Sequence, residues 1–340
     1  MIRSNLMRPS TETDVANILQ ETEQHRARRG MWFVLLASVL WGTTGTAQAL
    51  APAGASPLTI GYVRLTLGTV VLFLIAAQQG HLKSLKHWQS WPLRTTILAG
   101  AAVAAYQVFF FAGVARTGVA VGTIVGIGST PIAAGILTFL VFKTFPGRKW
   151  AVSTFLALIG CALLILSGGD LSVNGAGILL AMAAGTSYAL YTLLTKQLLE
   201  NKPRGAVLSI TFLIGSLLLL PILFIGDFSW LAEPRGILVA LHLGVITVGA
   251  AYTLYAMGLS IISVAATATL TLAEPLTAGL LGIFLLGEQL STMAVIGILL
   301  LLSGLMILVL NPRASLRRPT RNKSSIQAID IGKPTNNGDM

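Results

Sequence analysis

Three ionisable side chains, Arg64, His242 and Glu274, lie inside long apolar runs of the sequence. In a membrane such groups cost roughly 2.5 kcal/mol or more each on insertion scales, so they persist mainly when they are paired or face a polar cavity. Arg64 and Glu274 could offset each other's desolvation as an ion pair. Such a pair could gate a pathway, or it could anchor a zwitterionic solute by its carboxylate and its amine. The alternative is a static pair that locks two helices together.

Proton transfer is a second kind of chemistry that these residues could perform. Glu274 is the better candidate for proton coupling, because a carboxyl group removed from water can hold a proton reversibly. His242 could relay protons, since an imidazole titrates near neutral pH. A lone histidine near a helix end more often forms a local hydrogen bond or faces the lipid headgroups, and we favour that interpretation for His242.

Polar and aromatic side chains near the centres of the apolar runs are candidates for a solute cavity. A set of aromatic faces with a few hydroxyls suits an amphipathic organic solute, because rings stack on apolar parts and attract an ammonium group. Each of these side chains could equally be packed between helices. The candidates are Trp41, Thr43, Tyr106, Gln107, Ser129, Thr130, Tyr188, Thr192 and Tyr252.

Pro131 and Pro275 fall near the middles of their runs. A proline inside a helix removes one backbone donor and frees a carbonyl of the preceding turn, so we expect a kink at each position. The two prolines are candidate hinges for a rocking motion, and the alternative is a static bend that packing requires. Four glycines are interpreted as sites of close helix contact. These glycines are Gly135, Gly160, Gly279 and Gly304.

The elements that position these residues follow from composition. Hydrophobic residues make up 54% of the 340 residues and charged residues only 10%, whereas a soluble domain carries about 25% charged residues. Ten runs are long enough to cross a membrane as helices, and none alternates with the period of a strand. The sequence therefore predicts an all-α integral membrane protein with ten transmembrane helices. The runs are 31–50, 58–77, 95–115, 119–142, 150–166, 175–195, 206–225, 236–257, 263–286 and 292–310.

The 23 Lys and Arg residues are distributed asymmetrically between the loops. If the N-terminus is cytoplasmic, all of them except Arg64, Arg116 and Arg235 lie in cytoplasmic segments, as the positive-inside rule requires. We therefore predict a multi-pass protein of the bacterial inner membrane with both termini in the cytoplasm. Residues 1–30 are predicted as a cytoplasmic segment without a cleaved signal peptide, and residues 311–340 as a disordered cytoplasmic tail. The net charge of +11 does not indicate nucleic-acid binding, because the basic residues form no patch interleaved with aromatic residues.

The chain also repeats itself. Sliding the sequence by 144 positions aligns Pro131 with Pro275, and Gly160 with Gly304. Each half contains five runs, and an odd number places the second half in the membrane upside down relative to the first. Inverted repeats of this kind are a recurring plan of secondary transporters that work by alternating access. The alternative is a duplication that is kept only for stability.

The second half resembles the EamA-type members of the drug/metabolite transporter superfamily. The resemblance is carried by the run 272–278 (LAEPLTA), by the Gly287-Glu288 pair, and by Gly297 and Gly304. The first half matches less well, with Thr130-Pro131 and Lys143-Thr144 at the corresponding positions. The resemblance implies two inverted five-helix EamA repeats, at 31–167 and 175–310. It also implies transport of small metabolites, often export of amino acids as in the YddG-like exporters.

Other function classes lack support in the sequence. No P-loop, metal-ligand cluster or catalytic triad order is present, and Cys161 is the only cysteine. We therefore predict a transporter without cofactor or metal rather than an enzyme. Its expected partners are a small-molecule substrate and membrane lipid, and a monomer is compatible with the sequence. The favoured function is export of amino acids, with aromatic ones as the candidate substrates, and the alternatives are a carrier for a sugar, quaternary amine or drug, a lipid flippase, and a non-transporting membrane sensor.

Overall fold

The computed structural model of the chain describes residues 12–166, 174–286 and 291–312. The predictions for residues 1–11, for Gly287-Glu288 and for the tail beyond residue 312 lie outside the described residues. Every regular element in the described part is helical, which confirms the predicted fold class. The first half contains α1 (Glu12–Ala49), α2 (Pro57–Gln78), η1 (His81–Ser90), α3 (Leu93–Phe142) and α4 (Arg148–Leu166). The second half contains α5 (Gly175–Leu199), α6 (Arg204–Leu218), α7 (Ile222–Ile225), η2 (Ser229–Ala232), α8 (Pro234–Leu241), η3 (His242–Ala250), α9 (Ala251–Leu259), α10 (Val264–Leu270), α11 (Ala273–Leu286) and α12 (Thr292–Leu310).

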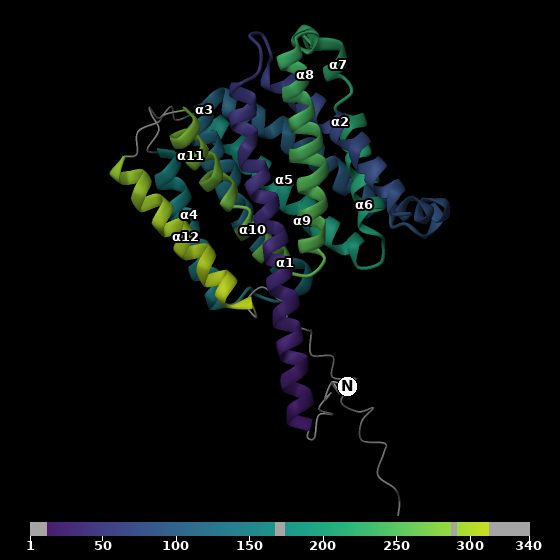
Figure 1. Cartoon of the computed structure of the whole chain (residues 1–340), viewed down its shortest axis with the longest axis vertical. Coiled ribbons are helices and arrows are strands. Elements are labelled where there is room, and N and C mark those ends of the chain that lie inside the picture. Colours follow the sequence, from purple (N-terminus) through teal and green to yellow (C-terminus); the bar gives the residue numbers. More distant parts are fainter. Residues whose placement is uncertain (1–11, 167–173, 287–290, 313–340) are drawn as a thin grey trace, which may run out of the picture.

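The helices reproduce the predicted spans, with differences at their ends. Nine described segments are long and apolar enough to cross a membrane, and Arg204–Leu218 is a shorter apolar helix in the position of the seventh predicted span. The helix of the first span begins well before the predicted residue 31, so that α1 extends beyond the bundle (Figure 1). The N-terminal segment was not predicted to be helical, because it is polar and its helix does not depend on burial in lipid.

The third and fourth spans form one continuous helical segment, α3, that folds back on itself. Residues eight apart in a straight helix are separated by about 12 Å. A Cβ added to Gly122, however, would lie only 2.9 Å from the Cα of Val114. One added to Gly126 would lie 3.3 Å from the ring of Phe110. The two arms of α3, Leu93–Thr117 and Gly122–Phe142, are therefore antiparallel neighbours joined by a very short turn.

Side-chain caps mark where several helices begin. Ser56 accepts a hydrogen bond from the Thr59 amide, directly before Pro57 at the first position of α2. Asn174 caps α5 in the same way, and Ser263 and Ser291 cap α10 and α12. Each cap satisfies a backbone donor that the helix leaves unpaired. The polar residues between the apolar runs thus define the ends of the spans.

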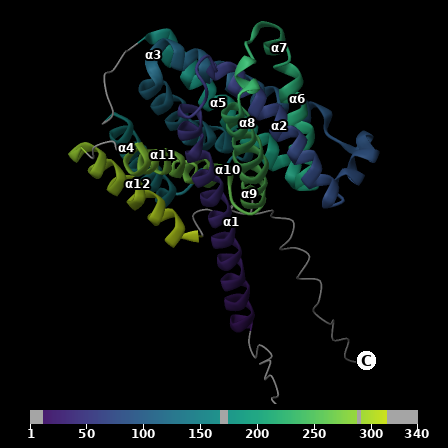
Figure 2. The same ribbon diagram turned by 45° about the horizontal axis from the view of Figure 1, so that its top comes forward.

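The contact between α4 and α12 displays the two-fold relation of the repeats. A Cβ on Gly160 would meet the Leu301 amide nitrogen at 2.4 Å and the Gly297 carbonyl oxygen at 2.6 Å. A Cβ on Gly304 would meet the Ala157 amide nitrogen at 2.7 Å and the Ser153 carbonyl oxygen at 2.6 Å. These two sets of residues are related by the same shift of 144 positions that aligns the halves of the sequence. The two helices lie side by side at one edge of the bundle in both views (Figures 1 and 2).

The two prolines have different surroundings. The ninth span is interrupted at Thr271-Leu272, between α10 and α11, one turn before Pro275. This is the position at which a proline leaves backbone groups unpaired. In the first half, α3 continues through Pro131 without interruption. The backbone at the two positions is therefore asymmetric, and the role of the prolines as hinges stays a prediction.

Basic residues gather at one end of the bundle, here called the basic end, where α1 enters it. Lys202 Nζ donates to Ser90 Oγ at 2.8 Å, which links the start of α6 to η1. Lys196 Nζ donates to the carbonyl oxygens of Leu259 at 2.6 Å and Ile262 at 2.9 Å. These bonds join the end of α5 to the loop between α9 and α10, and all seven residues of α10 are buried. The basic half of the bundle is therefore tightly closed.

The opposite half is less tightly packed around its centre. Gly45 lies one turn after the buried Trp41 on the same face of α1, yet it is exposed and a Cβ there would meet nothing within 4 Å. Arg64 and Glu274 are half-buried instead of buried. At Gly45, the face of α1 beyond Trp41 is therefore not covered by another helix.

Candidate functional site

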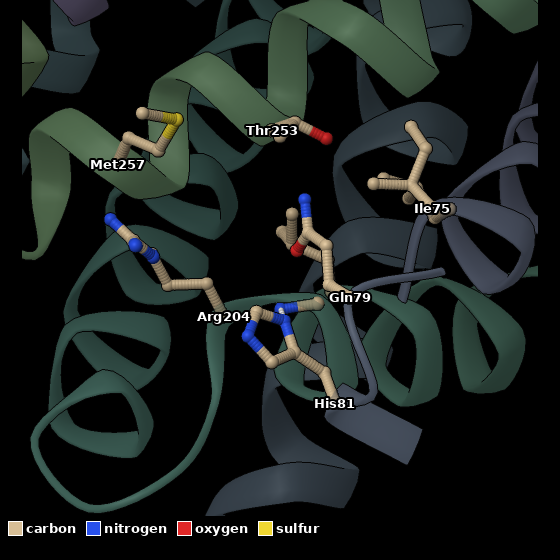
Figure 3. A pocket seen from close by; sticks show the side chains of 9 residues that line it. Ile75, Gln79, His81, Arg204, Thr253 and Met257 are labelled. Carbon is tan, nitrogen blue, oxygen red and sulfur yellow. Dashed lines mark hydrogen bonds between the residues drawn. The ribbon is translucent and has the colours of Figure 1, made fainter. Parts of the chain in front are cut away.

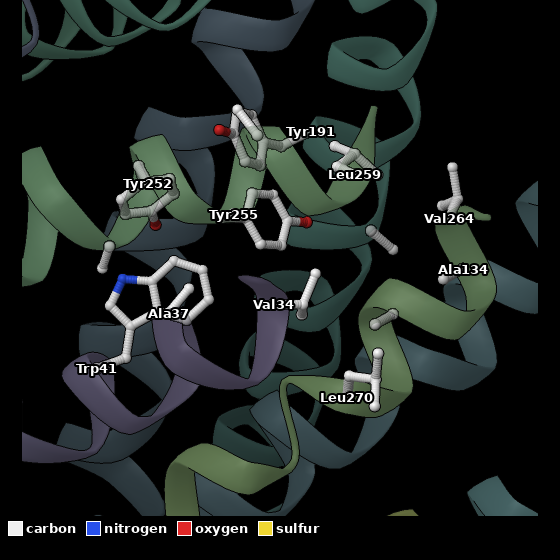
Figure 4. Close-up of a cluster of buried hydrophobic side chains, with 14 of the residues drawn as sticks. Val34, Ala37, Trp41, Ala134, Tyr191, Tyr252, Tyr255, Leu259, Val264 and Leu270 are labelled. Carbon is white, nitrogen blue, oxygen red and sulfur yellow. The ribbon is translucent and has the colours of Figure 1, made fainter. Parts of the chain in front are cut away.

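Aromatic rings from both halves of the chain form a cluster at the centre of the bundle. Trp41 on α1 lies 4.8 Å from Tyr252 and 5.3 Å from Tyr255 on α9, measured between ring centroids. Figure 4 shows these rings facing one another across the two helices, with Tyr191 of α5 behind them. Offset and edge-to-face contacts at such distances are the arrangements that aromatic pairs prefer. We call this group, together with Tyr106 and Tyr188, the aromatic cluster.

Tyr106 and Tyr188 connect the cluster to α3 and α5. The Tyr188 ring lies 5.4 Å from the Tyr106 ring and 6.4 Å from that of Trp41. The four aromatic candidates predicted from the sequence, Trp41, Tyr106, Tyr188 and Tyr252, therefore do come together. The structure shows that their rings are in contact, and their role in binding stays a prediction.

Two members of the cluster were missed by the sequence analysis. Tyr255 and Tyr191 follow Tyr252 and Tyr188 by three residues, and this spacing places each pair on one face of its helix. The repeated Tyr-x-x-Tyr pattern could have identified them. The oxygens of Tyr255 and Thr192 lie 2.7 Å apart, and Thr192 Oγ1 donates to the Tyr188 carbonyl oxygen at 2.9 Å. Thr192 therefore uses its own proton within α5 and accepts the proton of Tyr255.

Arg64 and Gln107 supply hydrogen-bond donors beside the aromatic cluster. Nε of Arg64 and Nε2 of Gln107 are buried, and neither has a hydrogen-bond partner among the described residues. Gln107 is 5% exposed, and its Nε2 lies 3.8 Å from a Cβ position on Gly61, one turn before Arg64 on α2. A buried donor without an acceptor carries the full cost of its desolvation. The two donors therefore lie buried and unpaired beside the aromatic cluster, and their role in binding stays a prediction.

Arg64 and Glu274 face the same region. The positive charge of Arg64 acts on Glu274, on Tyr106 and on Tyr252, and the charge of Glu274 acts on the same two tyrosines. Glu274 lies in the first turn of α11, immediately after the break in the ninth span. The predicted neighbourhood of the two charged residues is thus present beside the aromatic cluster, and their gating or coupling role stays a prediction.

His242 hydrogen-bonds to a residue of another helix instead of forming the local bond that its position favoured, and its gating or coupling role stays a prediction. Its Nε2 lies 2.9 Å from Oγ1 of Thr43, and Thr43 Oγ1 donates its only proton to the Leu40 carbonyl oxygen at 2.7 Å. His242 Nε2 must therefore be the donor to Thr43. The bond ties α1 to η3, a π-helix that is rare in proteins and is often found at functional sites. Trp41 Nε1 adds a second tie, since it donates to the Thr247 carbonyl oxygen at 2.8 Å.

Thr130 in the first half occupies the sequence position that corresponds to Glu274 in the second half. Its hydroxyl donates within α3 to the Gly126 carbonyl oxygen at 3.1 Å. A Cβ on Gly185 of α5 would lie 3.1 Å from the Thr130 amide nitrogen, while a Cβ on Gly42 of α1 would lie 2.8 Å from the Glu274 carbonyl oxygen. The two contacts are offset along the helix, because Gly185 also faces the Gly126 carbonyl, one turn before Thr130, whereas Gly42 also faces Thr277, one turn after Glu274. Ser129, beside it, also bonds Gly126, at 3.2 Å.

The central site therefore combines aromatic rings, two buried donors and one carboxyl group. The described residues contain no group of three or more His, Cys, Asp or Glu side chains that could hold a metal ion. Cys161 is 1% exposed and packs in the central core of the bundle.

The fold and this arrangement define a multi-pass membrane protein built from two related five-helix units. The chain belongs to the EamA-like transporter family, whose model matches residues 28–166 and 175–310. It is 44% identical over 281 residues to the uncharacterized transporter YwfM of Bacillus subtilis (strain 168), a match that covers 83% of this chain and 94% of YwfM. It is 26% identical over 295 residues to the uncharacterized inner membrane transporter YicL of Salmonella typhimurium, covering 85% of this chain and 98% of YicL. A solved crystal structure shares the fold with a TM-score of 0.73 at 18% identity, covering 84% of this chain and 97% of the other.

Proposed function

We propose that this transporter is a secondary carrier that exports amino acids, aromatic ones in particular, across the bacterial inner membrane. The observation that carries the proposal is the pair of unpaired buried donors, Arg64 Nε and Gln107 Nε2, beside an aromatic cluster and a carboxyl group. A substrate carboxylate would accept from the two donors in charge-assisted hydrogen bonds. Its ammonium group would lie near Glu274, and an apolar side chain would pack against Trp41 and Tyr252.

Alternating access is the mechanism that the repeats favour. Two units of opposite orientation can pack in two ways of similar energy, each open to one side of the membrane. In this structure the basic half is closed by Lys196 and α10, whereas the face of α1 beyond Trp41 is open at Gly45. The arrangement corresponds to one of the two states of such a cycle. In the other state, the equivalent contacts would form at the opposite end.

The orientation is proposed from the distribution of charge. The basic end carries Lys83, Lys196 and Lys202, and the positive-inside rule places such an end in the cytoplasm. Both termini would then be cytoplasmic, and the open half would face the periplasm. The solute would leave the cell from the state seen here.

Counterflow in proteoliposomes tests the proposal. We expect saturable exchange of labelled aromatic amino acids and weaker exchange of aliphatic ones, measured with and without a pH gradient, alongside a sugar and a quaternary amine. Arg64→Gln should lower the exchange of amino acids at least about tenfold, because one charge-assisted bond is lost. Arg116→Gln is the matched control, because Arg116 is exposed and its Nη1 bonds only the Ala112 carbonyl of its own helix, at 3.4 Å.

Other outcomes of this experiment separate the competing functions. Exchange of only the sugar or only the quaternary amine would identify a carrier for another class of solute. Absence of exchange across the whole panel, from protein shown to be folded, would contradict the proposal. In that case lipid scrambling and ligand binding without flux would be measured next, for a flippase and for a sensor respectively.

A further inference from the structure

A cavity lies at the basic end, outside the aromatic cluster, between α2, α6 and α9. Its volume is about 250 Å³. Leu72 and Leu208 form its buried inner wall, and Ile75 and Met257 are half-buried toward the mouth. The only inner hydroxyl, that of Thr253, already donates to the Gly249 carbonyl oxygen at 2.7 Å. The inner part of the cavity is therefore apolar.

The mouth of the cavity is polar and positively charged. Gln79, His81 and Arg204 line it, and Figure 3 shows their side chains on the side opposite Thr253 and Met257 of α9. No acidic residue is among the lining residues, so no carboxylate neutralises Arg204 within the cavity. A guanidinium group at the rim of an apolar cavity complements an anion that carries an apolar chain.

His81 adds a hydrogen-bond donor of defined orientation. Its Nδ1 accepts a hydrogen bond from the Gly205 amide at 3.2 Å, in the first turn of the 15-residue helix α6. In the neutral ring the proton must then be on Nε2, which is left as a donor at the cavity mouth. The amide end of α6 is at the same place and also favours a negative charge.

The level of the mouth matches that of lipid headgroups. Gln79 immediately follows the last residue of α2, and Arg204 is the first residue of α6, so the mouth lies where the apolar helices give way to polar loops. The headgroups of a bilayer begin at this boundary. Basic pockets between transmembrane helices at this level can bind acidic lipid headgroups.

We infer that this cavity binds an anionic phospholipid, with the phosphodiester between Arg204 and His81 and part of an acyl chain along Leu72, Ile75 and Met257. The site is independent of the solute site and does not depend on the proposed export function. Because a bound lipid would contact all three helices, the lipid composition of the membrane would affect how α2, α6 and α9 pack together.

Native mass spectrometry of the full chain in detergent, with thermal unfolding in parallel, tests the inference. Phosphatidylglycerol should remain bound and raise the unfolding midpoint, whereas phosphatidylcholine should do neither. Arg204→Gln should weaken phosphatidylglycerol binding about tenfold, as expected for one charge-assisted bond. Arg94→Gln removes an exposed arginine of the basic end outside the cavity and should leave binding unchanged.

Ile75→Trp provides a second test that keeps every charge. It should reduce lipid binding by filling the apolar part of the cavity, while the unfolding transition of the lipid-free variant confirms that it is folded. Equal binding by the wild-type chain, Arg204→Gln and Ile75→Trp would overturn the inference. Inorganic phosphate or glycerol 3-phosphate that gives the same stabilisation as phosphatidylglycerol, with the same loss in Arg204→Gln, would also overturn it, since the site would then require no acyl chain.

Discussion

At the scale of single residues, the central site combines side chains that have hydrogen-bond partners within the chain with buried donors that have none among the described residues. Thr192, Tyr255 and Trp41 have hydrogen-bond partners on neighbouring helices and fix the shape of the aromatic cluster. Arg64 and Gln107 keep unpaired donors at its edge. The first set therefore holds the cluster in place, and the second set is the one that the proposed function assigns to the solute.

Glu274→Gln should reduce flux without preventing folding. The amide has nearly the same shape as the carboxyl group but can neither carry a negative charge nor release a proton. We expect counterflow to fall about tenfold and to lose any dependence on a pH gradient. Glu233→Gln, the same change at an exposed acid that begins α8, serves as the control. Wild-type flux in Glu274→Gln would remove this residue from the mechanism.

The lipid cavity predicts a dependence on pH that originates at His81. Burial and the neighbouring charge of Arg204 hold the pKa of His81 below its usual value of 6.5. Protonation of Nδ1 would cost the hydrogen bond from the Gly205 amide, and a bound phosphodiester would offset that cost by favouring the charged ring, so lipid binding should take up a proton. Affinity for phosphatidylglycerol should therefore increase several-fold as the pH falls from about 8 to about 5.5.

Arg204 of α6 is the charged group that lines the cavity beside the imidazole, and α2 and α9 present Gln79, Thr253 and Met257. Lys83, Lys86 and a second histidine, His87, lie on η1 with His81. If His81 is the group that takes up the proton, His81→Gln should give a lipid affinity that does not change with pH, measured by the same native mass spectrometry. An undiminished pH dependence in that variant would assign the proton to another group.

At the scale of elements, glycines decide how closely the helices approach. The α4–α12 contact has backbone atoms directly opposite Gly160 and Gly304, so even one methyl group must push the helices apart. The same two-fold contact occurs twice, once for each repeat. The two glycines should therefore contribute equally to the stability of this contact.

Gly160→Ala and Gly304→Ala should each destabilise the protein, by about 1–3 kcal/mol, because the added Cβ overlaps backbone atoms of the partner helix. Unfolding monitored in detergent gives the comparison. Gly45→Ala, also inside a helix but with nothing within 4 Å of the added Cβ, should be neutral or slightly stabilising. Unequal effects of the two symmetry-related changes would argue against a true two-fold contact.

Much of this element structure could be predicted from the sequence, and the rest depends on packing. Apolar runs located the spans because the thickness of the bilayer sets the length of apolar sequence that each transmembrane helix needs. The fold-back within α3 was predicted as two separate spans, 95–115 and 119–142, whereas the very short turn, with Gly122 close to Val114, was not apparent. The π-helix η3 was not apparent either, because its sequence, HLGVITVGA, is apolar like that of its neighbours.

The candidate site was predictable in part for the same reason. Residue type identified Trp41, Tyr106, Tyr188 and Tyr252, since polar and aromatic groups are conspicuous in apolar runs. Which of them meet depends on helix rotation, which periodicity does not reveal in runs that are apolar on every side. His242 illustrates this point, because its partner Thr43 lies on another helix, 199 residues away.

At the scale of the whole molecule, the two repeats differ in how they are closed. The end of α5 is tied to the α9–α10 loop through Lys196. The corresponding face of α1, beyond Trp41, is open. A carrier that alternates between two states must open the closed end and close the open one. Because Cys161 is the single cysteine of the chain, replacing it leaves a background in which engineered cysteines can report this change.

The most direct test compares the accessibility of two engineered cysteines in a Cys161→Ala background. Gly45→Cys lies one turn after Trp41 on the open side, and Thr195→Cys lies one turn after Tyr191 on the closed side, at a residue with 0% exposure. Without solute, N-ethylmaleimide should react with the first cysteine and not with the second. During exchange of the best aromatic amino acid, the reactivity at position 195 should rise while that at position 45 falls. Reactivities that stay unchanged, or that rise together at both positions, would contradict transport by alternating access.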